Sequence, residues 1–291
     1  MVILREKDLS MTNIDMELCK NPKKIATDFI DTAMPNKVSY GKLKTFILAI
    51  AAGAFIAFGA QGSLTAMSGT DALAFGFAKL LGGIVFSTGL MLIVFTGSEL
   101  FTGNVLIGIS VLEKKATVAQ LLKNWFLVYL GNFVGAVIVA SLIYFANAYH
   151  GAGEVLGVMG LKVAYGKVNL TPSQAFASGI LCNWLVCMAV WLAAAAKDVA
   201  GKILAILFPI TTFAMSGYEH CVANMFMITN GLFVKTSEAV VAASGFTPEQ
   251  LSTLTIKSFL VDNLIAVTLG NIVGAFIFVV GIFWVAYIKR K

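Results

Sequence analysis

Three ionisable side chains lie in the middle of long apolar stretches of this chain. GSELFTGN, at residues 97–104, contains Glu99, and GYEHCVAN, at residues 217–224, contains Glu219 and His220. An ionisable group at membrane depth is costly and is a functional hypothesis by default. Histidine can also exchange a proton near neutral pH. We therefore expect His220 to exchange protons with a species that passes through the protein.

Both octapeptides predict a break in a helix. A break inside a membrane frees backbone N–H and C=O groups that cannot face lipid. We expect Glu99 and Glu219 to accept hydrogen bonds from these N–H groups, with direct contact to a permeating species as the alternative. Asparagine is a preferred helix N-cap. Asn104 and Asn224 are therefore predicted to cap the half-helices that follow, and their positive dipole ends would point toward the midplane.

Several further side chains near the breaks are candidates for a pathway. Thr102 offers a hydroxyl that could lie opposite His220. Apolar side chains next to the breaks could narrow the path, although each taken alone is more typical of a core or lipid-facing residue than of a gate. These candidate constriction residues are Phe86, Leu90, Leu100, Phe101 and Phe213.

The elements that hold these residues are predicted to span a membrane. The chain of 291 residues is 58% hydrophobic and 12% charged, whereas soluble domains carry about 25% charged residues. A spanning helix needs about 20 residues. The second and fifth apolar runs are too long for one span. Too few apolar residues follow each octapeptide to form another span, so each run is interpreted as one broken helix. The six spans are predicted at about 45–68, 73–112, 118–147, 172–197, 203–235 and 257–288.

The positions of the basic residues predict the orientation. Cytoplasmic loops of membrane proteins carry an excess of lysine and arginine. We expect the protein to lie in the cell (inner or plasma) membrane. If both of its termini are in the cytoplasm, most of the 21 basic residues lie on the cytoplasmic side. The lysines then left outside are Lys79, Lys162, Lys167, Lys235 and Lys257.

An internal repeat relates the two halves of the chain. Both octapeptides read G-x-E-x-x-x-[GA]-N, and residues 124–136 and 263–275 both read N-x5-LGN-x-VGA. Three spans per repeat would insert the copies in opposite orientations, as in many transport proteins. The sequence predicts an all-α membrane fold with an inverted 3+3 repeat and two broken helices. Residues 45–147 form the first repeat, 148–170 an extracytoplasmic connection, and 171–291 the second repeat with a short cytoplasmic C-terminus.

The N-terminal region, residues 1–44, is predicted to be cytoplasmic and to contain one amphipathic helix. Ile25, Phe29 and Ala33 share one face of a helix over about residues 23–35. Such a helix is expected to lie along the inner membrane surface. It would serve either as an anchor or as a mobile element that gates the inner mouth.

Other classes of function find little support in the sequence. Four cysteines without a CxxC pattern and two histidines predict no metal site, and we expect no cofactor. A membrane enzyme would need a nucleophile motif, HExxH or a phosphate loop, and none is present. Basic residues on membrane flanks give no reason to expect nucleic-acid binding. A neutral-solute channel of the aquaporin type fits the inverted plan, but its paired Asn-Pro-Ala motif is missing.

The two octapeptides, together with CNWLVCMAVWL at residues 182–192, resemble the formate–nitrite transporter family. The similarity runs from about residue 45 to 287. It implies an aquaporin-like helical fold in each protomer, a homopentamer and one pore per protomer. It also implies transport of a small monovalent anion or its conjugate acid. Formate is the first expectation, with nitrite and hydrosulfide as alternatives.

The resemblance also implies roles for individual residues. His220 matches a central pore histidine with Thr102 as its partner, and Leu100 and Phe101 match the loop residues that line the pore. Leu90 with Phe86 matches one apolar constriction, and Phe213 the other. Lys167 matches a vestibule lysine that attracts the anion, and Asn183 and Asn271 match polar residues beside the pore. The expected sequence is anion capture, transient protonation through His220 and water, passage of the neutral acid, and deprotonation on the far side.

Overall fold

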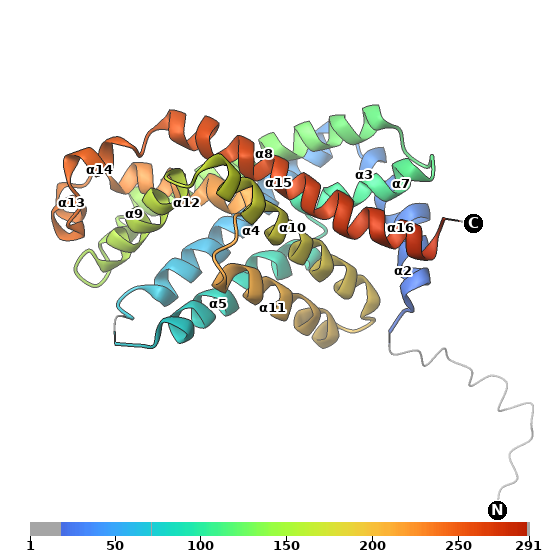
Figure 1. Ribbon diagram of the computed structural model, residues 1–291, viewed down its shortest axis with the longest axis horizontal. Coiled ribbons are helices and arrows are strands. Elements are labelled where there is room, and N and C mark those ends of the chain that lie inside the picture. Colours follow the sequence, from blue (N-terminus) through green and yellow to red (C-terminus); the bar gives the residue numbers. More distant parts are fainter. Residues whose placement is uncertain (1–18, 71, 290–291) are drawn as a thin grey trace, which may run out of the picture.

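Helices make up the architecture of the protein in a computed structural model that describes residues 19–70 and 72–289 (Figure 1). Within these described residues, five helical segments are long and apolar enough to cross a membrane. They are α4 (Lys42–Met67), α5 (Phe75–Thr96), α8 (Val118–Phe145), α10 (Pro172–Ala195) and a last segment, Ser258–Tyr287. This last segment comprises η4 (Ser258–Ile265), α15 (Ala266–Ala275), η5 (Phe276–Gly281) and α16 (Ile282–Tyr287).

The shorter apolar helices lie around two non-helical stretches. After α5, Gly97 adopts φ 68° and Leu100 is extended. The chain then continues as α6 (Phe101–Asn104), the 3-10 turn η2 (Val105–Ile107) and α7 (Gly108–Leu112). In the second half, α11 (Val199–Met215) and α12 (Cys221–Val234) flank Gly217, with φ 73°. Figure 1 shows α7 and α12 at opposite ends of the molecule.

The expected connection at residues 148–170 is largely helical. It contains the 3-10 turn η3 (Ala148–His150) and α9 (Val155–Val168), which packs against α12. Two further short helices follow α12 at the same end of the molecule (Figure 1). They are α13 (Glu238–Ser244) and α14 (Pro248–Ser252).

The apolar face of the N-terminal helical segment packs against the body of the protein. The segment runs through α2 (Pro22–Asp28), the π-helical turn η1 (Phe29–Ala33) and α3 (Met34–Ser39). Phe29 contacts Trp191 edge to face, with ring centroids 5.4 Å apart. The π-turn shifts the helical register, so Met34 is buried where Ala33 was expected. Because the apolar face is covered by the body of the protein, the segment is part of the fold.

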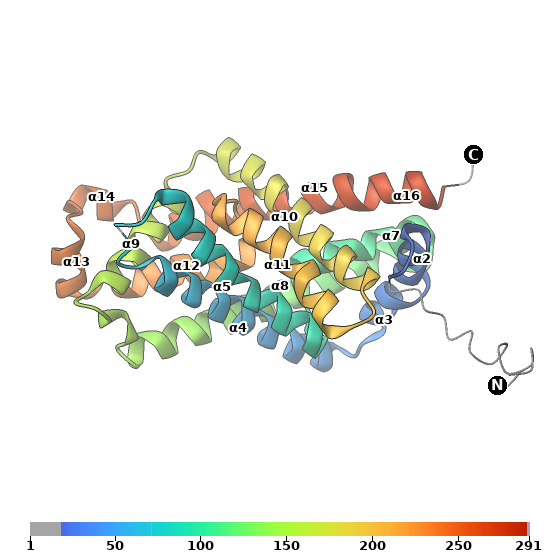
Figure 2. The same cartoon turned by 90° about the horizontal axis from the view of Figure 1, so that it is seen from below.

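Close approach of backbones holds the long helices together. The pairs α4 with α8 and α10 with α15 are in extensive contact, and α5 lies beside both α4 and α11 (Figure 2). A Cβ atom added at Gly53 of α4 would collide with the backbone carbonyl of Asn132, and one at Gly270 of α15 with that of Phe176. Small residues at such contacts let membrane helices pack closely.

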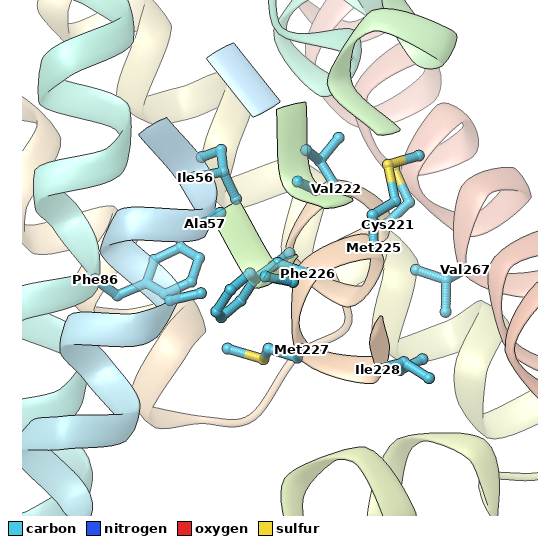
Figure 3. Close-up of a cluster of buried hydrophobic side chains, with 14 of the residues drawn as sticks. Ile56, Ala57, Phe86, Cys221, Val222, Met225, Phe226, Met227, Ile228 and Val267 are labelled. Carbon is cyan, nitrogen blue, oxygen red and sulfur yellow. The ribbon is translucent and has the colours of Figure 1, made fainter. Parts of the chain in front are cut away.

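Helix α12 lies in the interior of the protein. All its residues from Cys221 to Gly231 are buried. Figure 3 shows its side chains pointing to several sides. Phe226 points toward Ile56, Ala57 and Phe86 of α4 and α5, and Val267 of α15 lies on the other side, toward Ile228. A helix that is apolar on all sides requires such surroundings.

The backbone contact at Gly270 gives a testable consequence. Gly270→Ala is expected to lower the free energy of unfolding by about 1–3 kcal/mol, because the added methyl group must displace backbone atoms. Thermal unfolding of the purified protein in detergent measures the loss. Gly76→Ala is the matched control, because no atom lies within 4 Å of its added Cβ. Equal melting temperatures for the two variants would contradict this account of the helix contact.

Candidate functional site

His220 has both ring nitrogens engaged by the protein. It is the N-cap of α12, and its Nδ1 accepts a hydrogen bond from the Ala223 N–H at 3.1 Å. In the neutral ring the proton is therefore on Nε2, which lies 3.0 Å from Thr102 Oγ1. The ring is 2% exposed and Thr102 is fully buried. The structure thus brings together the two side chains that the sequence placed on opposite breaks.

The predicted caps are wrong by one helical turn. Leu100 and His220 occupy the N-cap positions, and Asn104 and Asn224 lie inside the helices that begin at Phe101 and Cys221. Each half-helix therefore starts earlier than the sequence indicated. The two asparagines are consequently available for side-chain contacts.

Asparagines of the long helices, and not the glutamates, receive the freed N–H groups. Phe101 N donates to Asn132 Oδ1 and Cys221 N donates to Asn271 Oδ1, both at 2.9 Å. Asn132 Nδ2 also donates to the Glu99 carbonyl at 2.9 Å, and Asn271 Nδ2 to the Glu219 carbonyl at 2.9 Å. Each amide thus bridges both sides of one break.

Glu99 belongs to a buried charged network. Its Oε1 lies 2.7 Å from Lys37 Nζ, and its Oε2 accepts a hydrogen bond from Asn104 Nδ2 at 2.6 Å. Asn104 Nδ2 also donates to Asn124 Oδ1 at 2.8 Å. Glu99 is 1% exposed, so this pairing compensates a charge that has almost no contact with solvent.

The second break carries the same network. Glu219 Oε1 lies 2.7 Å from Lys167 Nζ, and Oε2 accepts from Asn224 Nδ2 at 2.6 Å. Asn224 Nδ2 also donates to Asn263 Oδ1 at 2.8 Å, and Asn263 Nδ2 to the Lys167 carbonyl at 2.9 Å. Lys167, expected to attract an anion, is therefore paired with a carboxylate.

The two asparagines expected beside the pore have their amides engaged by the protein. Asn183 Nδ2 donates to the carbonyls of Thr102 and Asn271, at 3.2 and 2.7 Å. Asn271 Nδ2 also donates to the Gly179 carbonyl at 2.8 Å. Both residues are fully buried, and neither lines the three cavities described next.

Three neighbouring cavities lie around His220, and the smallest shares lining residues with each of the other two. A cavity of about 480 Å³ reaches Phe86, Phe213 and His220, and also contains Lys167 and Glu219. A cavity of about 270 Å³ on the other side reaches Leu90 and Leu100. Between them lies a space of about 10 Å³ that all five of Phe86, Phe213, Leu90, Leu100 and His220 line. The Phe86 and Phe213 rings meet edge to face, with centroids 5.4 Å apart.

Phe101 lies elsewhere. It packs edge to face against Tyr129 and Trp125 of α8, with centroids 5.0 and 5.9 Å away, and lines none of these three cavities. Its backbone N–H is fixed by Asn132, and this turns the ring toward α8. Four of the five predicted constriction residues thus meet around the small space, and Phe101 does not.

Sequence reasoning missed four residues of the networks. Asn124, Asn132 and Asn263 are three of the four asparagines of the N-x5-LGN repeat, for which only Asn271 was assigned a role. The sequence also contains a pattern that points to Lys37. A Lys-Val dipeptide lies at residue 37 before α4 and at residue 167 before α10, at the same distance from each helix. Aligning these dipeptides would have predicted Lys37 as the counterpart of Lys167.

The ion pair between Lys37 and Glu99 can be tested by a double-mutant cycle. Lys37→Met leaves a buried carboxylate unpaired, so the free energy of unfolding is expected to fall by about 3–5 kcal/mol. Lys37→Met combined with Glu99→Gln is expected to recover part of this loss, because no charge is then stranded. Thermal unfolding in detergent measures both, and exposed Lys123→Met is the control. A double variant no more stable than Lys37→Met would refute the coupling.

Comparison with known proteins gives a consistent result. The family model described as formate/nitrite transporter matches residues 23–285. Formate channel FocA of Escherichia coli (strain K12) is 42% identical over 257 residues, covering 88% of this chain and 90% of its own. A probable formate transporter of Methanothermobacter thermautotrophicus is 41% identical, covering 85% and 90%.

Solved structures show the same likeness. A pentameric formate channel with formate bound superimposes with a TM-score of 0.77 at 38% identity, covering 85% of this chain and 98% of that one. An ion channel of the FNT family gives a TM-score of 0.72 at 28% identity. These relatives are channels and transporters and not enzymes. The chain is therefore a multi-pass membrane protein that belongs to the formate/nitrite transporter family.

Proposed function

We propose that the protein is a channel for a small monovalent anion, with formate as its substrate, and that the anion passes His220. The observation that carries this proposal is the succession of cavities, in which two larger spaces meet at a small one beside the histidine. Relatives of this chain are named formate channels. The small space of about 10 Å³, which is room for about one water molecule, restricts the passage to small species.

The inverted architecture is part of the proposal. Residues 45–147 and 171–291 form two three-span repeats of opposite orientation, each with one broken helix, in an aquaporin-like plan. The two equivalent networks around Glu99 and Glu219 support this arrangement, as do the positions of α7 and α12 on different sides of the molecule (Figure 1). Both termini lie in the cytoplasm of a protein in the cell membrane, so the larger cavity faces outward.

A proton is central to the proposed mechanism. A bare anion in a narrow apolar passage loses its hydration at a large cost in free energy. The rings of Phe86, Phe213, Leu90 and Leu100 form such a passage on either side of His220. Transient protonation beside His220 lets formate cross as its neutral acid. Water in the larger cavity delivers the proton, while His220 Nε2–H and Thr102 Oγ1 hold the carboxylate by hydrogen bonds and the ring stays neutral. The neutral acid releases its proton again in the wider cavity on the far side of the small space.

Residues outside the passage have supporting roles in this proposal. Glu99, Asn104, Glu219 and Asn224 stabilise the breaks, and the amides of Asn183 and Asn271 fix the backbone next to the path. Phe101 anchors its half-helix to α8. The N-terminal helical segment either secures or gates the inner mouth, because Met34 and Lys37 line the smaller cavity.

The protein is proposed to function as a homopentamer in the lipid bilayer, with one pathway per protomer. Large apolar side chains are exposed on α8 and the last helical segment, and lipid or neighbouring copies must cover them. A related structure is described as pentameric. Nitrite and hydrosulfide match formate in charge and small size, so fluxes of the three from one preparation at two pH values rank them.

The proton role of His220 is tested by replacing its ring. His220→Phe keeps a planar side chain but removes Nε2, so formate uptake into proteoliposomes is expected to fall about a hundredfold or more, in the range by which assisted proton transfer changes rates. Wild-type uptake is expected to rise as pH falls, because protonation is required for passage. The control is His150→Gln, at an exposed histidine paired with Glu154.

Unchanged rate and pH dependence in His220→Phe would show that the histidine takes no part in proton transfer. Absence of formate uptake by the wild-type protein, with intact incorporation into the vesicles, would refute formate as the substrate. Osmotic shrinkage with water and glycerol, measured on the same vesicles, tests the aquaporin-type alternative.

A further inference from the structure

The larger cavity contains two lysines that the permeation pathway does not account for. Lys79, near the start of α5, and Lys162, on α9, line it together with Lys167 and one carboxylate, Glu219. The start of α5 and α9 lie at the same end of the molecule (Figures 1 and 2). Three lysines from two separate helices therefore line one space of about 480 Å³.

The charges of these lysines are not equivalent. Lys167 Nζ lies 2.7 Å from Glu219 Oε1, and its side chain is 13% exposed. At that distance the lysine and the carboxylate largely cancel each other's field for an ion farther away. Among residues 19–70 and 72–289, no carboxylate lies within 4.0 Å of the ammonium groups of Lys79 or Lys162. The net positive charge of the cavity therefore resides on these two residues.

We propose that Lys79 and Lys162, and not Lys167, supply the positive potential that concentrates small monovalent anions in the larger cavity. A cleft lined by charges of one sign raises the local concentration of counter-ions. Lys167 in turn holds Glu219 and thereby the second break. Capture of the anion and stabilisation of the break thus belong to different lysines of one cavity. The capture of formate itself rests on the proposed function, whereas the sign of the potential does not.

The potential can be measured without transport. Gly166 lines the cavity, and no atom lies within 4 Å of a Cβ added there, so Gly166→Cys places a thiol in it. Of the chain's four cysteines only Cys19 is exposed, so Cys19→Ser removes background reaction. The readout is the ratio of the reaction rates with a negatively and a positively charged methanethiosulfonate reagent.

On this background, Lys79→Gln with Lys162→Gln is expected to lower the ratio about three- to tenfold at low ionic strength. The change is expected to shrink in about 0.5 M salt, where the Debye length is only a few Å. The pair of arginine replacements preserves the charge and should retain the wild-type ratio. Lys257→Gln, at an exposed lysine outside the cavity, is the matched control and should leave the ratio unchanged.

Formate uptake by the same variants, in the full-length protein with native Gly166 and Cys19, links the potential to capture. The double glutamine variant is expected to need about three to ten times more formate for half-maximal rate, with little change in the maximal rate. A rate ratio in the double glutamine variant equal to that of the wild type would overturn the proposal. A change in the ratio that does not depend on salt, or that also occurs with the two arginine replacements, would overturn it as well. An altered ratio with unchanged half-saturation would overturn the role in capture. Lack of wild-type formate uptake refutes only the proposed substrate, because the thiol ratio still decides the potential.

Discussion

A helix that ends inside a membrane leaves backbone N–H and C=O groups without partners, and this constraint organises the centre of the protein. Two asparagine side chains meet it. Asn132 and Asn271 each accept from the first N–H of a half-helix and donate to a carbonyl before it. The long helices α8 and α15 thereby fix the positions of Thr102 and His220. The 3.0 Å contact between these two residues follows from that bridging.

The two glutamates keep the polar side chains around the breaks ordered in an apolar interior. Glu99 and Glu219 each pair with a lysine and an asparagine, so their charge is compensated and their lone pairs are used. Because Lys37 belongs to α3, the first network also ties the N-terminal helical segment to the first break. Folding of that segment and integrity of the break are therefore thermodynamically coupled.

The sequence predicted the elements better than their contacts. Run length and the two octapeptides located the ends of α5 and α11, because glycine and an ionisable residue interrupt an otherwise apolar pattern there. The facing of Thr102 and His220 followed from the repeat. The partners of the freed N–H groups did not, because a hydrogen bond from Phe101 to Asn132 joins residues far apart in sequence. Burial of the N-terminal segment also depended on a π-turn that residue periodicity does not reveal.

The hydrogen bond from the Ala223 N–H to His220 Nδ1 has a consequence for the energised membrane. A histidine conducts protons along a wire when one ring nitrogen takes up a proton while the other releases one. Here Nδ1 is occupied by a backbone donor, so in the proposed mechanism the ring does not pass a proton from one nitrogen to the other. The ring can assist an acid that passes by, yet it does not form a continuous proton conductor. On this proposal a proton crosses only together with formate, and the pathway does not by itself discharge the proton gradient.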